Sequence, residues 1–155
     1  MTAFKSILFF IVAPGMLGGF IPLALLRTGS QWKTGILSYG APLLWGIGLV
    51  MLIWCFWDFL AKGKGTPAPI DPPKHLVVAG FYRLVRNPMY VGVLFVLAGH
   101  FVWFGYWALA IYAVLFFLVV HTFVTRYEEP HLRKVFGAEY EEYCKQVSRW
   151  IPRIP

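Results

Sequence analysis

Charged side chains are absent from three long stretches of the chain, and these stretches predict its helices. The longest one, residues 87–125, contains no Asp, Glu, Lys or Arg. As one helix rising about 1.5 Å per residue it would be far longer than the roughly 30 Å hydrocarbon core of a bilayer. It therefore predicts two membrane-spanning helices, 88–104 and 107–126, folded as a hairpin near Gly105.

Two further uncharged stretches, residues 6–26 and 34–57, are each long enough for one span. They predict helices over 6–26 and 37–60. The predicted fold class is therefore an all-α integral membrane protein with four transmembrane helices, in a single membrane-embedded domain that covers residues 1–155.

The polar parts of the chain predict a loop and a last helix. Residues 62–74 are rich in proline and glycine, which excludes a regular helix there and predicts a cytoplasmic loop over 62–87. Between 128 and 147, apolar or aromatic residues recur every three or four positions. This spacing predicts an amphipathic C-terminal helix that lies on the membrane or caps the bundle.

Composition and charge support the membrane assignment. The chain is 59% hydrophobic, which is untypical of a soluble domain, and its formal net charge is +7. In the predicted topology, Arg27 and Lys33 are the only basic residues on one side of the membrane, and the other basic residues lie on the opposite side, with the termini. The positive-inside rule therefore places both termini in the cytoplasm. Basic residues beside membrane spans favour lipid headgroups over nucleic acid as the partner. Cys55 and Cys144 have no partner at suitable spacing, so neither a disulfide nor a metal site is predicted.

A first polar motif, residues 75–92, precedes the hairpin. Its glycines allow close backbone approach to a ligand, its arginines can meet a carboxylate, and its tyrosines offer ring faces and hydroxyls. These residues are Gly80, Gly92, Arg83, Arg86, Tyr82 and Tyr90. The alternative is a basic loop anchored beside the membrane by its arginines.

A second polar motif, residues 126–143, follows the hairpin. Glu128 and Glu129 stand where the last span would leave the bilayer, and a carboxylate there needs a cationic partner, which a cationic cofactor could supply. The alternative is an acidic start to the C-terminal helix, which favours the helix dipole. Because the hairpin returns the chain to its starting face, the two motifs together predict one active site facing the cytoplasm.

The two motifs, in this order around a hydrophobic hairpin, resemble those of the isoprenylcysteine carboxyl methyltransferase family and its relatives, the phospholipid N-methyltransferases. The resemblance covers about residues 65–155. The matching stretches are His75-Leu-Val-Val, Gly80-Phe-Tyr-Arg, Arg86-Asn-Pro-Met-Tyr-Val-Gly92, Glu128-Glu-Pro-His-Leu, Phe136-Gly-Ala-Glu-Tyr-Glu-Glu-Tyr143 and Val147-Ser-Arg-Trp-Ile-Pro152.

The resemblance implies an integral membrane enzyme that binds S-adenosyl-L-methionine in a cytoplasm-facing pocket and methylates a lipid-like or prenylated acceptor. The residues it implies for the cofactor pocket are His75, Leu76, Val77, Val78, Gly80, Tyr82, Arg86, Asn87, Pro88, Tyr90, Gly92 and Glu129. The residues it implies for catalysis are Arg126, which would orient a carboxylate acceptor, and Glu128 or Glu129, the candidate bases for an amine acceptor.

One position departs from the resemblance. Asn87 stands where better-known members of the family have His. The amide of Asn can form hydrogen bonds but cannot take up a proton at neutral pH. We therefore expect a binding role at this position and not a general base.

Two other function classes remain open alternatives. Membrane sterol and steroid reductases, which use NADPH, are similar in their C-terminal halves, although the Glu-Glu-x-x-Leu and Arg-Trp-Ile-Pro elements favour the methyltransferase. A small non-catalytic membrane scaffold is the other alternative, and the gathering of Arg, Tyr, Asn and Glu at one face argues against it. The sequence leaves the acceptor and the oligomeric state open.

Overall fold

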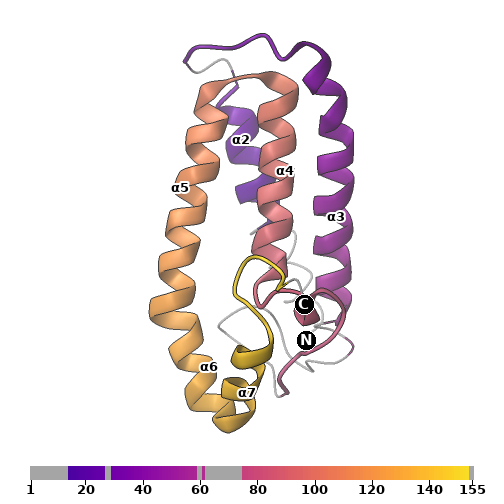
Figure 1. The fold of residues 1–155 in the computed structure, drawn as a ribbon. Helices are drawn as coiled ribbons and strands as arrows, with labels where there is room; N and C mark the ends of the chain where they lie inside the picture. The colour runs from indigo at the N-terminus through magenta and orange to yellow at the C-terminus, as the bar shows by residue number, and fades with distance from the viewer. Residues whose placement is uncertain (1–13, 27–28, 59–60, 62–74, 154–155) are drawn as a thin grey trace, which may run out of the picture.

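The computed structural model describes residues 14–26, 29–58, 61 and 75–153, and within this part it is helical with no strand. Three long helices, α3, α4 and α5, stand side by side, and the shorter α6 and α7 lie at one end of them (Figure 1). The helical elements are η1 (Met16–Phe20), α2 (Ile21–Ala24), η2 (Gly35–Gly40), α3 (Ala41–Asp58), η4 (Gly80–Arg83), α4 (Pro88–Phe104), α5 (Trp107–Phe123), η5 (Val124–Glu128), α6 (Glu129–Phe136) and α7 (Ala138–Gln146).

The hairpin predicted near Gly105 is present. Helix α4 ends at Phe104 and α5 begins at Trp107, as the uncharged stretch and its central glycine indicate. Gly105 adopts a left-handed conformation with φ of 72°, and a Cβ atom added there would lie 2.5 Å from the carbonyl oxygen of Trp32. Glycine is therefore required both by the backbone conformation and by the close approach of the 29–34 segment.

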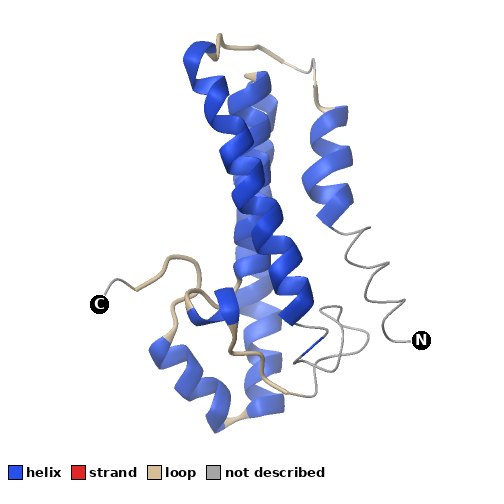
Figure 2. Cartoon of the chain, turned by 90° about the vertical axis from the view of Figure 1, so that its right-hand side faces the viewer, coloured by secondary structure: helices blue, strands red, loops and turns tan. Residues whose placement is uncertain are grey.

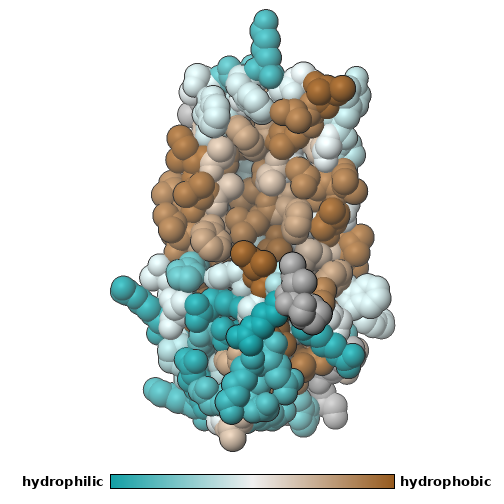
Figure 3. All heavy atoms as spheres, in the orientation of Figure 1, coloured by the Kyte–Doolittle hydropathy of each residue, from teal (hydrophilic) through white to brown (hydrophobic). Residues whose placement is uncertain are grey.

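The described helices have the length and surface of a membrane protein. Two of them, Gly35–Asp58 and Trp107–Phe136, are long and apolar enough to span a bilayer, and Pro88–Phe104 is a shorter apolar helix. Large apolar side chains point outward from these helices, such as Val119 at 68% exposure. The surface view shows an apolar band above a hydrophilic end (Figure 3). The predicted count of four spans stays a prediction, since the structure describes 6–26 only from Pro14 onward.

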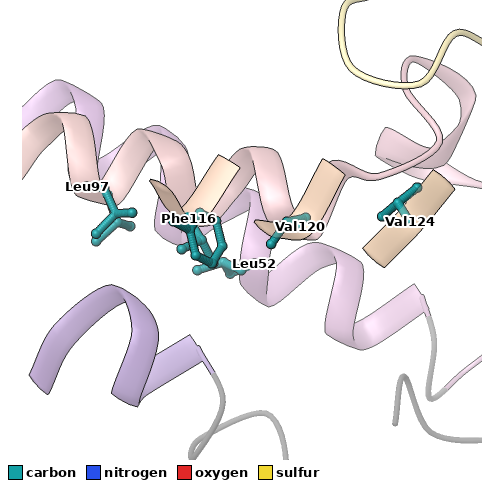
Figure 4. Packing of buried hydrophobic residues seen from close by; sticks show 7 residues of the cluster. Leu52, Leu97, Phe116, Val120 and Val124 are labelled. Atoms are coloured by element: carbon teal, nitrogen blue, oxygen red, sulfur yellow. The ribbon is translucent and has the colours of Figure 1, made fainter. Parts of the chain in front are cut away.

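Helices α3 and α4 meet at a glycine crossing. A Cβ atom added to Gly48 would lie 2.6 Å from the carbonyl oxygen of Gly92, so the two backbones are nearly in contact. Close packing of small residues is the main source of helix association where lipid surrounds the helices. Beside this crossing, a cluster of buried apolar residues joins α3, α4 and α5 (Figure 4). Its members are Leu52, Val93, Val96, Leu97, Phe116, Val120 and Val124.

The C-terminal helix differs from its prediction. The predicted helices 107–126 and 128–147 are not separate at residue 127, because the helix continues from α5 through a π-turn, η5, into α6 (Figure 2). The wider π-turn lies directly before Pro130, which has no backbone N–H to donate, so the helix passes this residue without ending. The helix ends instead at Gly137, where φ is 53° and ψ is −124°, and α7 follows as a separate segment.

Candidate active site

The chain after α7 returns to the loop that precedes α4. We call residues 147–150 the return segment; in Figure 1 it runs back toward the lower end of α4. Val85 and Ser148 form a parallel bridge, and the backbone N–H of Arg86 donates to the carbonyl oxygen of Ser148 at 2.9 Å. The side-chain amide of Asn87 donates to the carbonyl oxygen of Arg149 at 3.3 Å. The chain that follows the second predicted motif is therefore in direct contact with the first motif.

A buried tyrosine strengthens this contact. The hydroxyl of Tyr143 on α7 donates to the backbone carbonyl oxygen of Tyr82 at 2.6 Å. Both tyrosines are buried, and burial raises the pKa of each well above its usual value. Both hydroxyls are therefore neutral across the physiological range, which lets Tyr143 act as a stable hydrogen-bond donor.

Glu129 is the centre of a buried ion cluster. Its side chain is 3% exposed, and Arg149 binds both carboxylate oxygens, through Nε at 2.7 Å and Nη2 at 3.0 Å. Arg86 Nη1 lies 3.2 Å from Oε1, and Arg133 Nη1 lies 3.9 Å from Oε2. Three arginines thus neutralise this carboxylate, and the cluster joins the return segment to the loop before α4 and to α6.

The neighbouring carboxylate, Glu128, has different surroundings. The hydroxyl of Tyr90 on α4 donates to its Oε2 at 3.3 Å, and no basic side chain is paired with it in the part of the chain that the structure describes. The ring of Trp150 lies 6.4 Å from that of Tyr90 and 5.3 Å from that of Phe117. Trp150 Nε1 donates to Nδ1 of His121 at 3.1 Å, which fixes the indole. We call these five residues the Tyr90–Glu128 site.

The composition of this site suits a cation. A partly buried carboxylate whose only close described partner is a neutral hydroxyl favours a positive charge beside it. Aromatic ring faces such as those of Tyr90 and Trp150 attract cations through their quadrupoles. Glu129 lacks this capacity, because arginines already occupy both of its oxygens.

The structure brings five of the predicted site residues to one place. These are Arg86, Asn87, Tyr90, Glu128 and Glu129. Tyr82 and Leu76 lie beside them in the packing of α7, since Tyr82 accepts the bond from Tyr143 and Leu76 packs against Tyr140 and its neighbours.

Other predicted residues lie elsewhere. Gly92 packs where α4 crosses α3. A Cβ atom added to Gly80 would meet the side chain of Asp58 at the C-terminal end of α3. Arg126 is exposed, and its side chain makes no hydrogen bond or ion pair with another residue of the described part of the chain. The remaining predicted residues divide into the buried Val77 and Pro88 and the exposed His75 and Val78. A contact of any of these with a cofactor stays a prediction.

Sequence reasoning gave no role to several residues that complete the site. They are His121, Arg133, Tyr143, Arg149 and Trp150. The available signals were the stretches Phe136-Gly-Ala-Glu-Tyr-Glu-Glu-Tyr143 and Val147-Ser-Arg-Trp-Ile-Pro152, which carry the resemblance but do not reveal these contacts. Those contacts depend on the return of the chain after Gly137.

Fold and site together define a helical membrane protein with a carboxylate beside aromatic rings at its polar end. The family model of the phospholipid methyltransferases matches residues 36–139, which include α3, α4, α5 and both glutamates of the site. The chain belongs to the phospholipid methyltransferase family. This confirms the family predicted from the two motifs.

Curated proteins with similar sequences carry related names. A probable protein-S-isoprenylcysteine O-methyltransferase of Oryza sativa subsp. indica is 39% identical over 82 residues, covering 51% of this chain and 41% of that protein. The protein-S-isoprenylcysteine O-methyltransferase of Schizosaccharomyces pombe is 37% identical over 83 residues, covering 52% of this chain and 34% of that protein. An uncharacterized protein of Haemophilus influenzae is 33% identical over 63 residues, 41% of this chain and its own full length. The chain thus spans less than half the length of the two named relatives, and no solved structure matches it.

Proposed function

We propose that this protein is a membrane methyltransferase that moves a methyl group from S-adenosyl-L-methionine to a lipid-like or prenylated acceptor. Its family and the names of its relatives support the reaction class. The observation that carries the proposal is the Tyr90–Glu128 site, where a carboxylate without a described basic partner lies beside aromatic rings at the polar end of an apolar bundle.

The cofactor supplies a methyl group on a positively charged sulfonium when it is bound. In our proposal the carboxylate of Glu128 and the ring faces of Tyr90 and Trp150 hold that positive charge. The hydroxyl of Tyr90 fixes the orientation of Glu128 through the bond at 3.3 Å. Arg86 and Asn87 act indirectly, because they hold the return segment that carries Trp150.

Methyl transfer is an in-line displacement, and most of its catalysis comes from positioning the two reactants. A carboxylate acceptor needs no base and would be oriented by an exposed arginine such as Arg126. An amine acceptor must lose a proton, and Glu128 is the better candidate base, since the oxygens of Glu129 are engaged by arginines. The acceptor's hydrocarbon part stays in the bilayer beside the bundle.

We further propose four membrane spans with both termini and the site on the cytoplasmic side. The distribution of charge supports this orientation. Exposed basic residues gather at the end of the bundle that holds the site, among them Arg83, Arg126, Arg133 and Lys134. The opposite end carries aromatic side chains such as Trp103 and Trp107, which is typical of a membrane interface.

Calorimetric titration of the purified protein with S-adenosyl-L-methionine tests the proposal. We expect binding by the wild-type protein and a loss of at least about tenfold in affinity for Glu128→Gln, because a charge-assisted contact of about 1.5–3 kcal/mol is removed. The matched control is Glu139→Gln, which changes an exposed glutamate on α7 and should bind as the wild type does. Equal affinity in Glu128→Gln and Glu139→Gln would exclude the Tyr90–Glu128 site, and binding of NADPH in place of S-adenosyl-L-methionine would exclude the reaction class.

A further inference from the structure

A cavity lies within the membrane-spanning part of the bundle. Its volume is about 520 Å³, and it is lined by residues of the N-terminal segment, α3 and α4. Residues that line it include Gly15, Gly19, Trp45, Leu49, Val96 and His100. It shares no residue with the Tyr90–Glu128 site, so its contents are independent of the proposed function.

The cavity has a polar end and an apolar end. Trp45 is near the start of α3 and His100 near the end of α4, and both of these helix ends lie opposite the site (Figure 1). Ile53 and Val93 line the part that extends toward the middle of the bundle. A lipid in the leaflet opposite the site would have this same orientation, with its head outward and its chain toward the bilayer centre.

Hydrogen bonding at the polar end specifies the head group. Nδ1 of His100 lies 2.7 Å from the carbonyl oxygen of Val96, and since a carbonyl only accepts, we assign the ring proton to Nδ1. Nε2 is then an acceptor. The indole N–H of Trp45, which is 3.3 Å from that same Nδ1, cannot use a protonated nitrogen as its acceptor. The pair therefore offers one acceptor and one donor, the combination that a single hydroxyl satisfies.

The rest of the lining excludes other head groups. None of the described residues that line the cavity is Asp, Glu, Lys or Arg, so a phosphate or an ammonium group would be buried without a counter-charge. A plain hydrocarbon would fill the apolar part but leave the two polar groups unused. We propose that the cavity binds one long-chain lipid alcohol, with its hydroxyl between Trp45 and His100 and its chain along α3 and α4.

The test uses hexadecanol with a photoreactive diazirine in mid-chain, applied to the protein in phosphatidylcholine nanodiscs. Mass spectrometry locates the labelled peptides. We expect labelling of the α3 and α4 peptides that contain Leu49 and Val96. Unlabelled hexadecanol should compete at least about tenfold better than its methyl ether, which cannot donate a hydrogen bond.

Glycine variants provide the matched comparison. A Cβ atom added at Gly19 meets nothing within 4 Å, so Gly19→Leu fills the cavity without a clash, and we expect it to abolish labelling. Gly46 is also open but lies outside the lining, so Gly46→Leu should label as the wild type does. Gly15→Leu replaces the first variant if that one does not fold. Unlabelled α3 and α4 peptides in the wild type, undiminished labelling in the filled variant, or equal competition by the ether would each overturn the proposal.

Discussion

Removing the carboxylate of Glu129 should loosen the polar end of the bundle. The Glu129→Ala variant loses two hydrogen bonds from Arg149 and an ion pair with Arg86, and it leaves these guanidinium groups without their shared partner. Breaking a buried ion pair by deleting one partner costs about 3–5 kcal/mol. The side chain of Arg86 is 11% exposed, whereas those of Arg149 and Arg133 are 31% and 44% exposed and regain water. We therefore expect the lower end of this range, about 3 kcal/mol.

Thermal unfolding in detergent, followed by circular dichroism and tryptophan fluorescence, measures this loss. For a chain of this size each kcal/mol lowers Tm by about 2–4 °C, so Glu129→Ala should unfold about 6–12 °C below the wild type. Trp150 lies in the segment that the cluster holds, so the tryptophan fluorescence, to which Trp150 contributes, should begin to change at a lower temperature than the loss of helix.

The control is an ion pair of similar length in solvent. Glu142 and Lys145 on α7 are 3.2 Å apart, with side chains 58% and 74% exposed. Glu142→Gln should change stability by no more than about 0.5 kcal/mol. If Glu129→Ala and Glu142→Gln unfold at the same temperature, the buried cluster does not stabilise the site and our reasoning about the return segment fails.

Two further substitutions test the packing. Gly48→Ala should lower the free energy of unfolding by about 1–3 kcal/mol, because its Cβ atom would overlap the backbone of α4. Gly46→Ala, on the lipid-facing side of α3, should leave stability unchanged, and comparison of the two Tm values tests this difference. Tyr143→Phe should cost about 0.5–1.5 kcal/mol by removing the hydrogen bond that its hydroxyl donates to the carbonyl oxygen of Tyr82, and the exposed Tyr39→Phe should not; equal Tm values for these two variants would contradict the role of the hydroxyl.

The hairpin and its turn could be predicted because they depend on local properties. The uncharged stretch sets the length of α4 and α5, and Gly105 supplies the left-handed conformation at the turn. The start of α4 at Pro88 was also predicted correctly, since proline suits a first helical turn.

The roles of the two glutamates could not be predicted, because they depend on contacts between distant residues. Glu128 and Glu129 are adjacent in the sequence, yet one faces Tyr90 and the other faces Arg149. No local pattern distinguishes them. The sequence also suggested that Gly92 approaches a ligand, whereas the structure gives its small size a use in helix packing.

The π-turn Val124–Glu128 sets the angular position of everything that follows it in the helix. Its backbone N–H to C=O bond spans five residues, as Glu129 donates to Val124, so the segment holds one residue more than a regular turn would need. A regular α-turn covers nearly the same rotation with one residue fewer, so deleting one residue here would convert the π-turn to a regular turn and leave Glu129 facing Arg149. The number of residues between the hairpin and the acidic pair can thus vary by one without turning the glutamate away. Among related chains, we expect single-residue gaps in this segment, with a regular α-helix in the chains that carry them.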